Sequence, residues 1–186
     1  MRVIAGKYRS RKLKGPGKLR LRPTSDRLRE TLFNVLGPSV EDSLFVDLYA
    51  GTGAIGIEAI SRGARETIFI ESHAAATRLV RQNLDALGIC SGVEVMEADV
   101  VKGLKNLAAR HLLTDFIFLD PPYEGKEHLR ALEFLDASHL VAPYGLVIVE
   151  HHHSMELPER FDRLECTRLL EQGDAALSFY RLAAAA

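Results

Sequence analysis

Short apolar runs alternate with amphipathic stretches along most of the chain. Five runs of strand length, near residues 44–49, 66–71, 92–97, 115–120 and 145–150, predict buried β-strands. Between them, apolar residues recur at helical spacing, which predicts helices near 54–63, 73–88, 100–112 and 126–137. Strands that alternate with helices predict a Rossmann-like α/β fold, with a mostly parallel sheet of seven strands covered by helices on both faces.

The C-terminal part departs from this alternation. Residues 161–170 and 175–182 have no helical stretch between them, and Gly173-Asp174 is a turn sequence. These residues therefore predict an antiparallel hairpin that completes the sheet. The last four residues, 183–186, are all alanine and carry no argument about function.

The N-terminal part departs from the alternation as well. Apolar residues interleave with basic ones before and after Gly6, which predicts a short β-hairpin in a basic segment, residues 1–22. The main domain is predicted to span 23–182. Its first helix should begin after an N-cap at Thr24 or Ser25 and end at Gly37-Pro38.

Charge is distributed unevenly along the chain. The net charge is −1, yet residues 1–36 hold eleven Lys and Arg against two acids. A basic segment on an acidic body predicts a polyanionic partner, with nucleic acid favoured over a solvated tail. The candidate RNA contacts are Arg2, Lys7, Arg9, Arg11, Lys12, Lys14, Arg22 and Arg27.

Other classes of function are not favoured by the composition. No apolar run approaches membrane-spanning length, and the two cysteines have no paired spacing, so a cytoplasmic enzyme without disulfides or zinc is expected. The run 151–153 is three histidines, which we interpret as a solvated turn, with no metal site predicted.

A glycine-rich loop follows the first apolar run. Gly51-x-Gly53-x-x-Gly56 leads into a helical pattern, and Glu71 ends the next apolar run twenty residues after Gly51. This arrangement is typical of a nucleoside-cofactor site, in which the acid accepts hydrogen bonds from ribose hydroxyls. NAD and S-adenosylmethionine (SAM) both fit that pattern.

Asp47 favours SAM. A carboxylate at the entrance of the loop would repel a pyrophosphate but would pair with the ammonium of an amino-acid moiety. The alternative is a strand-end acid that accepts hydrogen bonds from loop amides, which is compatible with either cofactor. Asp99, after the third apolar run, could accept from the adenine amine or could cap the following helix.

Residues 120–123 are Asp-Pro-Pro-Tyr and directly follow a buried apolar run. The prolines end the strand, and the carboxylate of Asp120 with the carbonyl of Pro121 could accept the two N–H bonds of an exocyclic amine. Tyr123 could stack on the ring that bears the amine. An ordinary turn at the end of a strand is the alternative.

These motifs resemble class I SAM-dependent methyltransferases, and Asp-Pro-Pro-Tyr resembles the subset that methylates exocyclic amines. Three stretches, at 2–6, 22–34 and 47–63, are similar to the bacterial small-subunit ribosomal RNA guanine-N2 methyltransferases of the D type. The resemblance implies SAM as donor and a guanosine of 16S ribosomal RNA as acceptor. From its size the chain is expected to act as a monomer. It implies a cofactor site of Asp47, Ala50, Gly51, Thr52, Gly53, Glu71, Ser72 and Asp99, and a catalytic set of Asp120, Pro121, Pro122 and Tyr123.

Two other functions stay open. Adenine-N6 methylation of DNA or RNA would use the same Asp-Pro-Pro-Tyr, although the chain has little room for a domain that reads DNA sequence. A non-catalytic RNA-binding protein that keeps the fold is the alternative from another class.

Overall fold

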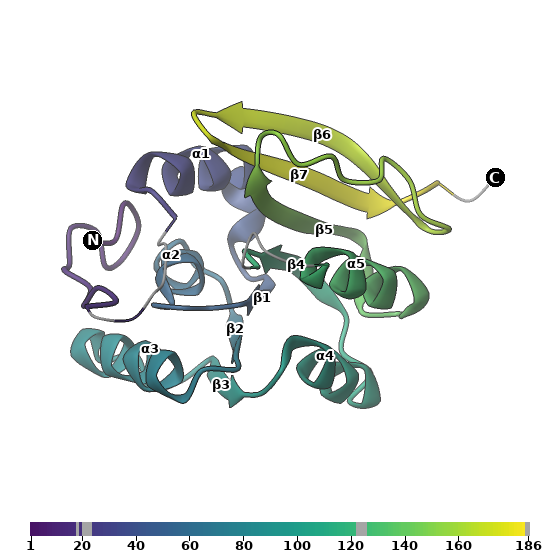
Figure 1. Ribbon diagram of the computed structural model, residues 1–186. Coiled ribbons are helices and arrows are strands. Elements are labelled where there is room, and N and C mark those ends of the chain that lie inside the picture. The colour runs from purple at the N-terminus through teal and green to yellow at the C-terminus, as the bar shows by residue number, and fades with distance from the viewer. Residues whose placement is uncertain (18, 20–23, 122–125, 185–186) are drawn as a thin grey trace. The chain divides into compact units, whose positions relative to one another are not determined.

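The computed structural model describes residues 1–17, 19, 24–121 and 126–184 (Figure 1). Its helices are α1 (Asp26–Leu36), α2 (Ala54–Ser61), α3 (Ala74–Leu87), α4 (Val100–Ala109) and α5 (Glu127–Ala137), with a 3₁₀ helix at Gly37–Val40. Its strands are β1 (Leu44–Leu48), β2 (Glu66–Glu71), β3 (Val93–Glu97), β4 (Thr114–Leu119), β5 (Val141–His152), β6 (Leu164–Gln172) and β7 (Ala175–Leu182). The seven strands found in these described residues belong to one mixed sheet, so the predicted α/β class is confirmed.

The chain divides into two compact units. The first, Met1–Asp99, contains the strand order β3-β2-β1, and both pairs are parallel. Every residue of β1 is buried. A core cluster of the same unit joins residues of α2 and α3 to Phe69 of β2. One residue of this buried strand is an acid, Asp47, and it lies one position before the strand ends.

The second unit, Val100–Ala186, contains the order β4-β5-β7-β6. The β4–β5 pair is parallel, while β7 is antiparallel to both β5 and β6, which confirms the predicted C-terminal hairpin. Strand β5 begins at Val141, four residues before the predicted start. Pro143 lies near a register shift between β4 and β5, where a residue without an N–H donor is tolerated.

The first helix begins and ends as predicted. Ser25 is the N-cap of α1, and its Oγ accepts a hydrogen bond from the Leu28 N–H at 3.1 Å. Gly37 is the C-cap, with a φ of 58° and an N–H that donates to the Phe33 carbonyl. Across the residues that the structure describes, we find no helix with the length and apolar character needed to cross a membrane.

The predicted N-terminal β-hairpin is wrong. The segment of residues 1–14 folds back on itself, but an isolated bridge between Arg2 and Lys12 takes the place of paired strands there. The physical reason is that its backbone bonds elsewhere: the amides of Ile4 and Ala5 donate to the carboxylate of Glu58 at 2.8 and 3.0 Å. Backbone bonds such as Val3 N–H to the Arg11 carbonyl and Leu13 N–H to the Met1 carbonyl close the segment on itself, and the Glu58 bonds dock it on α2. We call residues 1–14 the docked segment.

Candidate cofactor and acceptor site

The glycine loop joins the end of β1 to the start of α2. Tyr49, Gly51 and Gly53 all have positive φ values, of 62°, 56° and 77°. Tyr49 is the notable one, because a bulky residue adopts this conformation only where its surroundings enforce it. Gly53 is the N-cap of α2 and has no side chain with which to cap it, so the first amides of the helix face the loop.

The third glycine of the motif has a different role. A Cβ placed on Gly56 would lie 2.3 Å from the Phe69 ring, so only glycine lets α2 pack this closely against β2. Gly56 therefore serves helix–strand packing.

Asp47 is 2% exposed, and its Oδ2 accepts a hydrogen bond from the Gly56 N–H at 2.9 Å. The donor is an amide in the first turn of α2, and such a bond is compatible with either cofactor. Burial raises the pKa of Asp47 to about 8, the Gly56 hydrogen bond opposes that rise, and the negative charge of Glu71 adds to it. Among the described residues no salt bridge to Asp47 is found, so a bound cation would stabilise its ionised form.

Glu71 ends β2 and connects two loops. Its Oε2 accepts from the Gly51 N–H at 2.9 Å and its Oε1 from the His73 N–H at 2.8 Å. The structure thus brings Asp47, Gly51 and Glu71 together, as the spacing predicted. Ala50 and Thr52 are buried within the loop.

The remaining cofactor candidates lie at the surface of the same unit. Ser72 and Asp99 are both exposed, Ser72 directly after β2 and Asp99 directly before α4. The position of Asp99 suits either contact with an adenine amine or capping of α4, so both interpretations stand.

The acceptor motif begins where β4 ends. Asp120 is partly buried and directly follows Leu119, and Pro121 is buried. Because β4 runs parallel to β5, Asp120 lies at the carboxyl end of a buried parallel strand, where α/β folds place their ligands. Pro122 and Tyr123 lie outside the described residues.

The candidate RNA contacts share one property. Arg2, Lys7, Arg9, Arg11, Lys12, Lys14 and Arg27 are all exposed. The bonds that hold the docked segment in place come mainly from its backbone, so its basic side chains remain at the surface. Arg22 lies outside the described residues.

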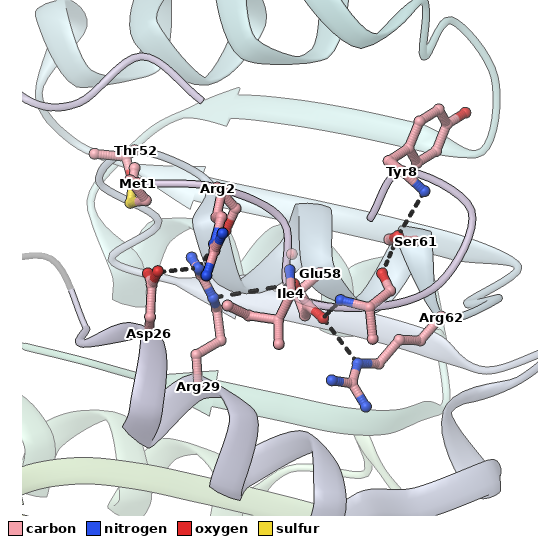
Figure 2. A network of polar contacts seen from close by, with 12 residues as sticks. Met1, Arg2, Ile4, Tyr8, Asp26, Arg29, Thr52, Glu58, Ser61 and Arg62 are labelled. Carbon is pink, nitrogen blue, oxygen red and sulfur yellow. Dashed lines mark hydrogen bonds and ion pairs between the residues drawn. The ribbon is translucent and has the colours of Figure 1, made fainter. Parts of the chain in front are cut away.

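One basic residue near the N-terminus is internal. Arg29 is fully buried, and its guanidinium is 2.9 Å from Asp26, donates to the Arg2 carbonyl and lies 4.0 Å from Glu58 (Figure 2). Burial lowers the pKa of Arg29, and the neighbouring carboxylates Glu58 and Asp26 oppose this. The positive charge that residues 1–36 can present to a polyanion is therefore smaller than their eleven Lys and Arg suggest, because Arg29 is buried.

Sequence reasoning missed the residues that hold the docked segment. Glu58 is 0% exposed, and its Oε1 also accepts from Arg62 Nε at 2.9 Å. Ser61 accepts from the Lys7 amide through its carbonyl and from the Tyr8 amide through its hydroxyl (Figure 2). One signal was available: Glu58 is the single acid inside an otherwise apolar helical run.

The interpretation of the three histidines as a solvated turn is wrong for the first of them. His151 belongs to β5, is 3% exposed and lies 2.9 Å from the Ser178 hydroxyl through its Nε2, and burial lowers its pKa. Its position opposite Ala176 in the ladder accounts for this burial. His152, His153 and Asp174 place potential ligand atoms within 4.8 Å of one another, and the predicted absence of a metal site stays a prediction.

A glycine loop with left-handed turns, an acid that ends β2 and an acid that directly follows β4 define an α/β protein of the nucleoside-cofactor class. The chain belongs to the family described as Conserved hypothetical protein 95, whose model matches residues 1–181.

Named relatives and solved structures agree with this assignment. The chain is 34% identical to the Ribosomal RNA small subunit methyltransferase D of Haemophilus influenzae over 185 residues, 98% of this chain and 92% of that one. It is 34% identical to the Escherichia coli K12 protein of the same name over 158 residues, 85% and 78% of the two chains. The E. coli structure described as "Putative methyltransferase yhhF" is 32% identical, with a TM-score of 0.83 over 100% and 99% of the chains.

Proposed function

We propose that this protein transfers the methyl group of SAM to the exocyclic N2 of a guanosine in 16S ribosomal RNA. One observation carries the proposal: a chain that aligns almost end to end with a small-subunit ribosomal RNA methyltransferase also has a built glycine loop. The acceptor motif of this protein begins with an acid, Asp120, directly after the buried strand β4. A ribosomal substrate places the proposed reaction in the cytoplasm.

The first unit fits SAM by its donors and acceptors. The loop amides and the start of α2 offer N–H groups, Glu71 offers carboxylate oxygens for ribose hydroxyls, and Asp47 is a desolvated acid that a substrate ammonium would ionise. Asp99 is the candidate acceptor for the adenine amine. When bound, SAM supplies a methyl group already activated by its sulfonium.

The acceptor residues have a positioning role in this mechanism. Asp120 and the Pro121 carbonyl accept the two N2–H bonds of the guanine, which directs the nitrogen lone pair at the methyl carbon. The N–C bond forms as the C–S bond breaks, and the proton lost from N2 passes to Asp120 or to water. Asp120 need not be a strong base, because the amine becomes acidic once it is methylated. Pro122 and Tyr123 complete the proposed platform, Tyr123 by stacking on the extruded base.

The exposed basic side chains of the docked segment, with Arg22 and Arg27, are the proposed RNA contacts. Phosphate contacts release counterions, so RNA affinity should fall as salt rises. Binding that does not change between low and moderate salt would remove these residues from the proposal.

The experiment that tests the proposal uses labelled SAM and small ribosomal subunits that lack the modification. We expect N2-methylguanosine by mass spectrometry of the nucleosides, and we expect Asp120→Ala to abolish it while SAM binding survives. Asp162→Ala is the matched control, because Asp162 is an exposed acid of the same unit. Near-normal turnover in Asp120→Ala would overturn the mechanism.

The same experiment separates the other functions. Labelled N6-methyladenosine would indicate the adenine enzyme. A protein that binds subunits but shows no rise in melting temperature with SAM would be a non-catalytic RNA-binding protein.

A further inference from the structure

The docked segment contacts the glycine loop as well as the outer face of α2. Val3 and Leu13 are buried in the same core cluster as Ala50 and Ala54, which lie on either side of the loop's Gly51–Gly53. The Thr52 hydroxyl lies 3.8 Å from the sulfur of Met1 (Figure 2). The docked segment, which bears most of the proposed RNA contacts, thus lies against the proposed cofactor loop.

Asn83 joins the two directly. It lies in α3 and is 1% exposed. Its Oδ1 accepts from the Lys14 N–H at 2.8 Å, and its Nδ2 donates to the Lys14 carbonyl at 3.2 Å and to the Thr52 carbonyl at 2.9 Å. One buried amide therefore bridges the end of the docked segment and the middle of the loop.

The chemistry of an amide explains why asparagine is needed here. Both donors and the acceptor of the group are engaged, and a buried polar group is tolerated only when its hydrogen bonds are made. The Thr52 carbonyl belongs to a loop whose neighbouring residues adopt left-handed conformations, so its orientation depends on such external contacts.

We infer that Asn83 is a positioning residue through which the docked segment fixes the glycine loop, so that RNA and SAM bind cooperatively. The inference rests on the proposed function and deepens it. The docked segment, which would contact RNA, also supports the loop that would hold the cofactor. RNA that immobilises the docked segment reduces the ordering cost at the loop, and SAM does the same for RNA by reciprocity.

The test measures coupling in the full chain. The affinity for S-adenosylhomocysteine, which permits no turnover, is measured by calorimetry with and without saturating unmodified 16S ribosomal RNA. We expect RNA to tighten this affinity about fivefold or more in the unchanged protein. Asn83→Ala should weaken the affinity about tenfold without RNA and bring the ratio of the two dissociation constants close to one.

Two control variants isolate the bridge. Gln82→Ala removes an exposed amide next to Asn83 on the same helix, and both the affinity and the ratio should stay within about twofold of their original values. Lys14→Ala removes a charge but keeps the backbone bonds to Asn83, so RNA binding should weaken in this variant.

Two outcomes overturn the inference. One is a folded Asn83→Ala variant with unchanged affinity and ratio. The other outcome needs no variant. It is that the unchanged protein binds both ligands, but its affinity for S-adenosylhomocysteine is the same with and without RNA. Failure of the proposed function differs from both, because it would show as no binding of the cofactor product or no methylation of subunit RNA.

Discussion

The docked segment and the C-terminal hairpin both lie near the ends of the chain, yet they are held by different interactions. The β6–β7 hairpin forms an antiparallel ladder from Leu164↔Leu182 to Gln172↔Ala175, with one register shift between Cys166 and Arg168. The docked segment has a single isolated bridge and is held by the side chains of Glu58, Ser61 and Asn83. A ladder distributes its stability over many similar bonds, whereas the docked segment depends on a few buried groups.

The largest expected effect that tests this contrast comes from Glu58→Ala. Removal of the carboxylate takes one negative charge away from the buried guanidinium of Arg29. It also leaves the amides of Ile4 and Ala5 without their hydrogen-bond acceptor. We expect the free energy of unfolding to fall by about 3–5 kcal/mol, measured by urea denaturation. Glu171→Ala, the same change at an exposed position of β6, should cost less than about 0.5 kcal/mol. Equal costs would show that the docked segment is no more dependent on single groups than the hairpin.

A smaller effect distinguishes Glu58 from Asp47, another buried acid of the first unit. Glu58 lies beside Arg62, whereas Asp47 accepts from one amide and has a pKa raised to about 8 from 3.8. Between these two values the folded state keeps a proton that the unfolded state has lost. Stability should therefore fall as pH rises from about 5 to 8, by up to about 1.4 kcal/mol per pH unit.

Asp47→Asn isolates this dependence, because an amide cannot titrate. The difference in free energy of unfolding between the variant and the original protein should shift in favour of the variant as pH rises. Parallel curves over this range would contradict the raised pKa. Calorimetry in buffers of different ionisation enthalpy should also show proton release when SAM binds at pH 6–7.

The smallest effect compares two glycines with positive φ. A Cβ on Gly6 would lie 1.8 Å from the Ser61 carbonyl oxygen, whereas one on Gly173, in the β6–β7 turn, would meet nothing within 4 Å. Gly173→Ala should cost about 1 kcal/mol from backbone strain alone. Gly6→Ala should cost about 2 kcal/mol and should speed hydrogen exchange at the Ile4 and Ala5 amides. Similar exchange in the two variants would mean that the close contact at Gly6 does not hold the segment.

The sequence predicted the ladder and failed on the docked segment for one physical reason. Strand and helix periods repeat within a few residues, so β1, β2 and the β6–β7 hairpin lie close to their predicted positions. The bonds from the docked segment to Glu58, Ser61 and Asn83 join residues 53 to 69 positions apart, and most of them pair backbone with side chain, which leaves no periodic signal. The predicted hairpin rested on alternation that instead serves to bury Val3 and Leu13 in the core.

The candidate site follows the same rule. Asp47, Gly51 and Glu71 could be predicted because fold geometry fixes their spacing, and the structure brings them together. Asn83 could not be predicted, because nothing local separates a buried asparagine of α3 from an exposed one such as Asn106 of α4. His151 was misinterpreted because a run of polar residues indicates a turn, although the period of β5 places this one in the interior.

The distance along the chain between the docked segment and its anchors sets an order of events during synthesis. Ile4 leaves the ribosome 54 residues before Glu58, and Lys14 leaves 69 residues before Asn83. At translation rates of about 5–20 residues per second, the most basic part of the protein is made roughly 3–14 s before the groups that hold it. The nascent chain therefore carries a basic segment without its full set of anchors until α2 and α3 have been made.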